Sequence, residues 1–271
     1  MRIAVAGGTG WAGCLVVDAV RAAGHEPVIL ARSTGVDLIR SSGLDEALTG
    51  VPVVIDVSNV STINRKKSEN FFGTATGNLL TAGQRVGVRH HVALSVVGVD
   101  RVNWGYYAGK RRQERLVLDG AVPATVLRST QFYELAAQML ASIPGPITVV
   151  PQMLIQPIAA HEVAHRLVAL ALADPAGRAP DIAGPQQLLM PDMARRLLRA
   201  RGSHRVVLPV RLPRATGRAM AGDGLLPTGP GPRGKQTFDQ WLASPAAQKA
   251  VACTGGPRSP ALRTEAGRRP P

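Results

Sequence analysis

The sequence predicts an α/β fold: a doubly wound parallel sheet of the Rossmann kind with a small C-terminal substrate region. Three observations predict it. Short runs rich in Val, Ile and Leu alternate with longer segments of helical spacing, as in a parallel sheet covered on both faces. The first of these runs ends in a glycine cluster that leads into a helix. The chain has 271 residues, 45% hydrophobic and 18% charged, which suits a large domain with a sizeable core.

The first half of the chain carries the alternation. Each expected strand is a short apolar run, and each expected helix has apolar residues three or four positions apart. The first helix is expected to stop at Gly24, a residue type that commonly ends helices. Strands are expected over residues 1–8, 27–32, 51–57, 88–98 and 124–129, and helices over 11–23, 68–83 and 106–118. Right-handed crossovers between such strands favour a doubly wound sheet.

The alternation weakens after residue 150, which sets the expected domain limits. We expect a dinucleotide-binding domain over residues 1–150. A small substrate-binding region, interleaved with the sheet, is expected over residues 151–244. Residues 245–271 are mostly small, polar and basic, so we expect a disordered tail there.

The formal net charge of +14 raises the question of a nucleic-acid partner. Much of the excess is local, because the segment from Arg195 to Arg218 is rich in arginine and contains no Asp or Glu. No helix-turn-helix, zinc-finger or aromatic-rich RNA-binding signature accompanies it, which disfavours nucleic-acid binding. The alternative, binding through this segment, would weaken steeply with salt.

Cellular location is judged from the apolar runs and the cysteines. No apolar run reaches the length of a membrane helix, and the N-terminal segment does not resemble a signal peptide. Cys14 and Cys253 do not make a disulfide framework. We therefore expect a cytoplasmic protein without a membrane partner; the sequence gives no indication of its oligomeric state.

The glycine cluster predicts a dinucleotide site. Gly7, Gly10 and Gly13 have G-x-x-G-x-x-G spacing between the first strand and the first helix. Glycine allows a tight turn and a close approach of the backbone to a pyrophosphate, and the helix N-terminus offers free N–H groups to it.

The residues at the end of the second strand indicate which dinucleotide the chain binds. NAD-binding chains usually place Asp or Glu there to bind the ribose 2′-hydroxyl. This chain has Arg32 followed by Ser33, a pair of donors suited to a 2′-phosphate, while Asp37 comes five residues after Arg32. The sequence therefore predicts NADP, with NADPH preferred over NADH; the alternative is a solvated arginine at a strand end.

Tyr106 and Lys110 form a Y-x-x-x-K pattern in an expected helix, where positions i and i+4 share a face. A cation beside a phenol favours the phenolate and would lower its pKa, so Tyr106 could act as a general acid toward a carbonyl. Ser95 ends the preceding strand and could face the same cleft, and Glu114 could restrain Lys110. The competing interpretation is that Tyr106 simply packs.

Taken together, these stretches resemble the NmrA-like group of atypical short-chain dehydrogenases/reductases. The matching segments are VAGGTGWAG, FFGTATGNLLTAGQRVGVRHHVALSVVGVD, GYYAGKRRQERL, ATVLRSTQFYE and QPIAAHEVAHRL, which cover most of residues 1–185 in the expected order. The resemblance implies catalytic roles for Ser95, Tyr106 and Lys110, with Lys110 also contacting the nicotinamide ribose. It implies a nucleotide lying over Gly7, Thr9, Gly10, Trp11 and Arg32, with Asp37 or Leu38 and the end of IDVSNV near the adenine side and Phe132 beside the nicotinamide. With Gly13 and Ser33 from the motifs above, and Lys110, these are the expected cofactor-binding residues.

The resemblance leaves two functions open. One is NADPH-dependent reduction of a small carbonyl or quinone substrate. The other is a non-catalytic, NADP-binding redox sensor that regulates a partner.

The segment from His161 to His165 reads H-E-x-x-H, the pattern of a zinc-peptidase helix. The longer zinc-peptidase pattern fails, because Val168 stands where it requires glycine, and Arg166 follows the second histidine. The resemblance instead implies a helix near the substrate side with a buried stripe, formed by Val163, Leu167 and Leu170 or Ala171. We therefore expect no metal, with both histidines on the helix surface.

Overall fold

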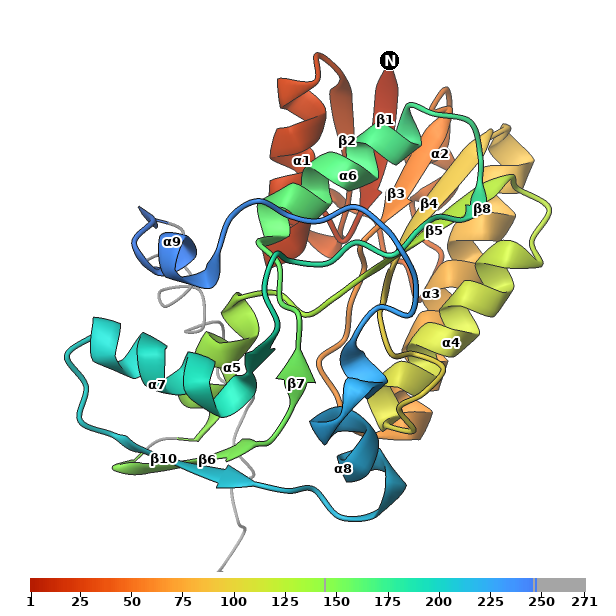
Figure 1. Ribbon diagram of the computed structural model, residues 1–271. Coiled ribbons are helices and arrows are strands. Elements are labelled where there is room, and N and C mark those ends of the chain that lie inside the picture. The colour runs from red at the N-terminus through yellow and green to blue at the C-terminus, as the bar shows by residue number, and fades with distance from the viewer. Residues whose placement is uncertain (144, 246, 248–271) are drawn as a thin grey trace, which may run out of the picture.

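The computed structural model describes residues 1–143, 145–245 and 247, and its centre is a six-stranded sheet (Figure 1). The strands stand in the order β2-β1-β3-β4-β5-β8, and every neighbouring pair is parallel. They are β1 (Arg2–Ala6), β2 (Glu26–Leu30), β3 (Val53–Asp56), β4 (His90–Val96), β5 (Ala124–Ser129) and β8 (Gly177–Arg178). The predicted α/β, doubly wound fold is confirmed.

Helices cover both faces of this sheet (Figure 1). On one face α1 (Trp11–Ala22) packs against α6 (Ala160–Ala171), over a core that includes Ile3 and Val5 of β1. On the other face lie α2 (Leu44–Leu48), α3 (Arg65–Val86) and α4 (Gly105–Leu118). Ala4 and Ala6 face this second core, as the alternation of side chains along a strand requires.

The boundaries of α3 differ from those expected. The helix begins three residues before the predicted start because Asn64 caps it, its side chain accepting a hydrogen bond from the Lys67 N–H at 2.9 Å. It ends at Gly87, which adopts a left-handed conformation with φ +80°. The short helix α2 was not predicted.

A smaller region lies beyond the carboxyl ends of the strands (Figure 1). It contains a parallel pair, β6 (Ile147–Pro151) with β10 (Val206–Val210), and an antiparallel pair, β7 (Leu154–Ile155) with β9 (Leu188–Leu189). Its helices are α5 (Glu134–Ser142), α7 (Met190–Ala200), α8 (Arg214–Ala221) and α9 (Phe238–Leu242). These elements build a third apolar core, separate from the two that flank the main sheet, around Tyr133, Phe238 and Trp241.

The domain limits expected from the sequence remain a prediction. Within the region expected to bind substrate, β8 returns to the main sheet beside β5. The tail expected over residues 245–271 lies outside the described residues except for residues 245 and 247. Among the described helices, none combines the length and apolarity needed to cross a bilayer.

The strand order defines where a ligand is expected. The chain leaves β1 to form β2 on one side, then forms β3 on the other side of β1. In doubly wound sheets ligands bind at such a switch point, at the carboxyl ends of the strands. The glycine cluster follows β1 at this point.

Candidate active site

The glycine loop connects β1 to α1 at the switch point. Gly7 has φ +78°, and a Cβ there would lie 2.9 Å from the Ser58 Cα atom. A Cβ on Gly13 would lie only 2.0 Å from the Gly7 carbonyl oxygen, so these two glycines are required by the turn itself. Gly10 is the N-cap of α1 and gives no side-chain cap, which leaves N–H groups of the first helical turn available to an anion.

Two aromatic residues predicted to contact the cofactor meet beside this loop. The rings of Trp11, the first residue of α1, and Phe132, just after β5, lie 5.7 Å apart between centroids with a tilt of 59°. Both are partly exposed, and Thr9 in the loop is exposed. The structure therefore brings Phe132 next to the glycine loop although 119 residues separate Gly13 from it, by the difference of their numbers.

The residues predicted to select the nucleotide occupy a short turn after β2. Arg32 and Ser33 are exposed in the turn Arg32–Thr34, and neither side chain makes a hydrogen bond within the described part of the chain. Asp37 is already engaged: its Oδ1 atom accepts hydrogen bonds from the N–H groups of Ile39 and Arg40, at 2.8 and 3.1 Å. These bonds lower the pKa of Asp37, so it closes a turn as an ionised group.

Lys110 is buried in a polar chain that sequence reasoning missed. Its Nζ atom donates to the Leu94 carbonyl and to Oε1 of Gln113, both at 2.9 Å. Gln113 in turn donates to Oδ2 of Asp56 at 2.9 Å, and Asp56 Oδ1 accepts the Ser58 N–H. Burial lowers the pKa of Lys110 to about 8, with Asp56 and Glu114 opposing that change. Asp56 stands at the end of a buried apolar run, and an acidic residue in that position could have indicated a functional site. Nothing in the sequence around Gln113 indicated its role.

Tyr106 lies at the start of α4, one turn before Lys110. Its hydroxyl donates to Oδ1 of Asn59 at 3.0 Å, and its ring lies edge-on to Phe72. Burial, with a smaller contribution from Tyr107, raises the pKa of Tyr106 far above its usual value. The lowering expected from a neighbouring cation is not found, because Lys110 points to the Leu94 carbonyl and Gln113 instead.

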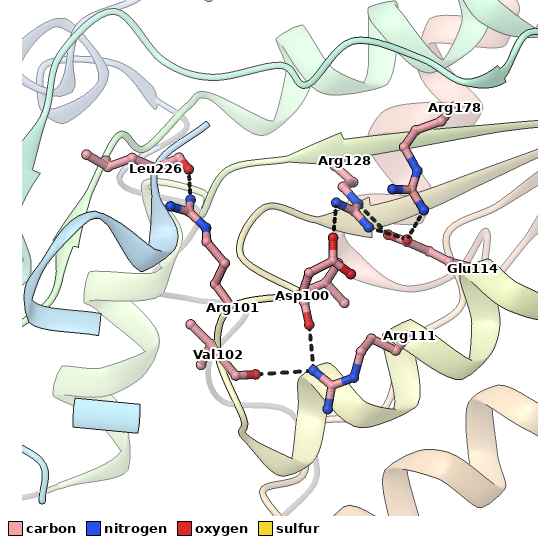
Figure 2. Close-up of polar contacts among 9 residues, drawn as sticks. Asp100, Arg101, Val102, Arg111, Glu114, Arg128, Arg178 and Leu226 are labelled. Atoms are coloured by element: carbon pink, nitrogen blue, oxygen red, sulfur yellow. Dashed lines mark hydrogen bonds and ion pairs between the residues drawn. The ribbon is translucent and has the colours of Figure 1, made fainter. Parts of the chain in front are cut away.

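Glu114 does not bind Lys110, contrary to expectation. It forms a two-pronged ion pair with Arg128 of β5, at 2.8 and 2.6 Å, and both side chains are at most 10% exposed (Figure 2). Asp100 and Arg178 extend the cluster through contacts of 2.7 and 3.4 Å. The planar guanidinium of Arg128 matches two carboxylate oxygens, which explains why it takes this partner. The cluster ties α4 to β5 and to the loop after β4.

Unpartnered polar atoms mark where a ligand could bind. Ser58, Ser95 and Gln131 lie at or just beyond the ends of β3, β4 and β5. All three are buried, and the Ser58 and Ser95 hydroxyls and both amide atoms of Gln131 lack hydrogen-bond partners within the described residues. Buried polar atoms are normally paired, so these suit a polar ligand at this edge. Ser95 was predicted; Gln131 was not, because isolated glutamines carry no sequence signal.

The H-E-x-x-H segment lies in α6. Val163, Leu167, Leu170 and Ala171 are buried, which confirms the predicted stripe, and His161 and His165 are exposed. Glu162 accepts hydrogen bonds from the N–H groups of Lys235 at 2.6 Å and Gln236 at 3.3 Å. In the described part of the chain, no group of three potential ligands could hold a metal ion. The glutamate therefore anchors the C-terminal segment.

Comparisons with known proteins support the fold. No family profile matches the chain, and no curated protein matches it. A short-chain dehydrogenase/reductase superfamily protein from Agrobacterium tumefaciens with bound NAD aligns with a TM-score of 0.66 and 18% identity, covering 93% of this chain and 98% of that one. RMD from Pseudomonas aeruginosa, complexed with NADPH, aligns with a TM-score of 0.67 and 15% identity, covering 93% of this chain and 99% of that one.

A third structure, the UDP-glucose 4-epimerase of Thermus thermophilus in complex with NAD, aligns with a TM-score of 0.65 and 15% identity. It covers 94% of this chain and 99% of its own. At such identities the likeness establishes the fold. The chain therefore has the Rossmann-like fold of these nicotinamide-nucleotide-binding proteins, and the narrower resemblance to NmrA-like proteins remains a prediction.

Proposed function

We propose that the protein is an NADP(H)-dependent oxidoreductase of the short-chain dehydrogenase/reductase type that reduces a small carbonyl or quinone. The observation that carries the proposal is the glycine loop at the switch point, with unpartnered Ser95 and Gln131 at the same sheet edge. The similar solved structures support it, because they contain bound NAD or NADPH. NmrA-like proteins are the subgroup we favour.

The residues fit a dinucleotide. Gly7 and Gly13 keep the loop free of Cβ atoms, and the first turn of α1 offers its N–H groups to the phosphates. Thr9 and Gly10 would line the pyrophosphate, and Trp11 and Phe132 would flank the nicotinamide side. Arg32 and Ser33 would hold a 2′-phosphate, with Asp37 stiffening the turn behind them. When bound, the nicotinamide supplies a hydride.

Each proposed catalytic residue has one task. The unpartnered Ser95 hydroxyl would bind the carbonyl oxygen of the substrate. Tyr106 would give its proton to that oxygen as the carbon is reduced, and would regain a proton from solvent. Its raised pKa keeps Tyr106 protonated near neutral pH but also makes it a weaker acid, so bound cofactor and substrate would have to lower that pKa for efficient proton transfer. Lys110 would orient the cofactor ribose from its buried site.

One observation favours the alternative, a non-catalytic NADP sensor. The Lys110 Nζ atom is committed to Leu94 and Gln113, and the Tyr106 hydroxyl to Asn59. A site whose acid and cation both have protein partners could bind the nucleotide without turnover. In that case nucleotide occupancy would change the affinity for a partner protein.

Calorimetric titration with NADPH and then NADH, with a zinc chelator present, is the first test. We expect tight NADPH binding and weaker NADH binding, with the preference reduced about tenfold or more in Arg32→Ala. No binding of either nucleotide would refute both the reductase and the sensor. Equal binding of both would refute the assignment of Arg32.

Turnover separates the enzyme from the sensor. We would screen quinones, small carbonyl compounds and sugar nucleotides, the last because UDP-glucuronic acid appears in the description of one similar structure. Tyr106→Phe should lose at least about 100-fold in kcat while keeping NADPH affinity. The matched control is Tyr133→Phe, which removes a phenol hydroxyl bonded to the Gln236 carbonyl outside the proposed site. Equal losses in both variants would exclude a specific proton-donor role for Tyr106.

A further inference from the structure

Helices α3 and α4 pack side by side on the opposite face of the sheet from α1 (Figure 1). Side chains of these two helices line an open groove of about 390 Å³. Its lining is almost entirely charged and consists of Arg65, Glu69, Ala108, Arg111, Arg112 and Arg115. The proposed function uses none of these residues.

Helix periodicity explains why the arginines gather there. Arg111, Arg112 and Arg115 lie three, four and seven residues after Ala108, along one face of α4. The opposite face of α4 carries Lys110 and Glu114, which are buried and paired with protein groups. One face of α4 therefore buries charged groups that are paired, while the other face carries arginines that have no ion pair within the described residues.

The charges in the groove are not balanced. Glu69 pairs with Arg65 at 3.0 Å, which neutralises that arginine. Arg111 donates to the uncharged carbonyls of Val99 and Val102, at 2.5 and 3.3 Å (Figure 2). Within the described residues, Arg112 and Arg115 have neither an ion pair nor a side-chain hydrogen bond. Arg112 and Arg115 thus lack a counter-charge within the described residues, and Arg111 beside them has only carbonyl partners, an arrangement that an anion would stabilise.

The groove is also shaped for one of these arginines. A Cβ on Gly73, in the interior of α3, would lie 2.4 Å from the Arg112 Nε atom. Glycine in a helix interior costs roughly 0.5–1 kcal/mol relative to alanine. Here it gives the Arg112 guanidinium room against the α3 backbone. Arg111 is held by two carbonyls, whereas Arg112 packs against α3 at Gly73 without a hydrogen bond of its own.

We propose that this groove binds the phosphate groups of a small ligand that carries two or more phosphates. Guanidinium groups bind phosphate oxygens in pairs, and several in fixed positions favour clustered phosphates over a single charge. The groove is open to solvent and has room for a small, highly charged ligand. The pocket lining consists of a few residues on two helices, whereas a nucleic-acid backbone requires a longer basic track. The site is separate from the glycine loop and does not depend on the proposed function.

Calorimetry with inorganic tripolyphosphate tests the proposal on the full-length protein at about 0.15 M salt. We expect saturable binding that weakens at least about tenfold in the double variant Arg112→Ala/Arg115→Ala. The matched control, Arg199→Ala/Arg218→Ala, removes the same charge from exposed arginines elsewhere and should stay within about twofold of the wild type. Gly73→Ala keeps every charge but displaces Arg112, and should also weaken binding.

Three results would overturn the proposal. They are an absence of saturable binding, equal losses in the groove and control variants, and unchanged affinity in the groove variant, which would place the ion at the glycine loop. ATP distinguishes the sources of phosphate: equal affinity indicates that the phosphates alone are recognised, and higher affinity indicates a nucleotide ligand. Far tighter, steeply salt-dependent binding of a short oligonucleotide would instead favour nucleic acid.

Discussion

Residues 1–143 and residues 145–245 are held in place by different kinds of contact. In the first part, parallel strands bury continuous apolar runs between two layers of helices. In the second part, β8 joins the main sheet and the other strands form two-stranded sheets. One face of the β6–β10 pair leaves its apolar side chains exposed: Ile147, Val149, Val206 and Leu208.

The second part has its own apolar core and, in addition, side chains that bind distant main-chain groups. Arg205 donates to the carbonyls of Leu140 and Gly145, at 3.0 and 2.7 Å, and also to the Ile143 carbonyl. Glu162 accepts main-chain N–H groups of the C-terminal segment, and the Tyr133 hydroxyl donates to the Gln236 carbonyl at 2.6 Å. The second part therefore combines an apolar core with a few long-range polar contacts that fix its loops and its C-terminal segment.

The largest loss of stability is expected from a substitution at a backbone contact in the first part. Alanine at Gly13 would place its Cβ 2.0 Å from the Gly7 carbonyl, and both groups belong to the glycine loop. We expect Gly13→Ala to destabilise by about 4 kcal/mol or more and to abolish NADPH binding. Thermal unfolding and calorimetry measure these losses. Gly77→Ala in α3 is the control, because its Cβ would meet nothing within 4 Å; a similar loss there would contradict the explanation.

Arg205→Ala should give the largest effect in the second part. It removes the common donor of three carbonyls and of the Thr148 hydroxyl; the contacts to Leu140 and Thr148 are partly buried, whereas the Ile143 and Gly145 carbonyls are exposed and can bind water instead. We expect a loss of about 2 kcal/mol, or roughly 4–8 °C in Tm for a chain of this size. Arg199→Ala, at an exposed position of the same segment, should change Tm by less than about 2 °C. Equal effects would show that net charge matters more than these bonds.

Glu162→Ala sharpens the comparison at one contact. It leaves the N–H groups of Lys235 and Gln236 without their acceptor, so we expect a loss of about 2 kcal/mol. Faster hydrogen exchange at residues 234–242 should accompany it, because this segment is tied down there. His161→Ala, on the exposed side of α6, should alter neither quantity, and added zinc should change neither protein. Stabilisation of the wild type by zinc would revive the metal hypothesis.

The same contrast explains what could be predicted from the sequence. Periodicity and the glycine spacing predict the strands, α1 and the loop, because these depend on neighbouring residues. The stripe of α6 was predictable for the same reason, and so was the exposure of its histidines. The Lys110–Gln113–Asp56 chain and the Glu114–Arg128 pair join residues of different elements, and a single sequence does not show which polar groups meet. The expectation that Lys110 would lower the pKa of Tyr106 failed for that reason.

The smallest effect concerns a carboxyl buried where the two parts meet. Glu134, in the first turn of α5, accepts a hydrogen bond from Trp241 of α9 at 3.1 Å, while its other oxygen has no partner within the described residues. Burial raises its pKa from 4.5 to about 7, and the bond from Trp241 opposes that change. The folded protein thus binds this proton more tightly than the unfolded chain does. The associated stability is fully present below pH 4.5 and is lost as the pH rises to about 7.

Glu134→Gln should remove this dependence, because the amide stays neutral and keeps the acceptor for Trp241. The new NH2 group lacks a partner, which offsets part of the gain, so we expect about 1 kcal/mol of stabilisation at pH 8. The variant should gain no stability at pH 5, where Glu134 is already protonated in the folded protein. Tm measured across this range tests it, with Glu46→Gln on exposed α2 as the control. If the gain in stability is equal at pH 5 and pH 8, the packing between α5 and α9, not the buried charge of Glu134, determines the stability at this contact.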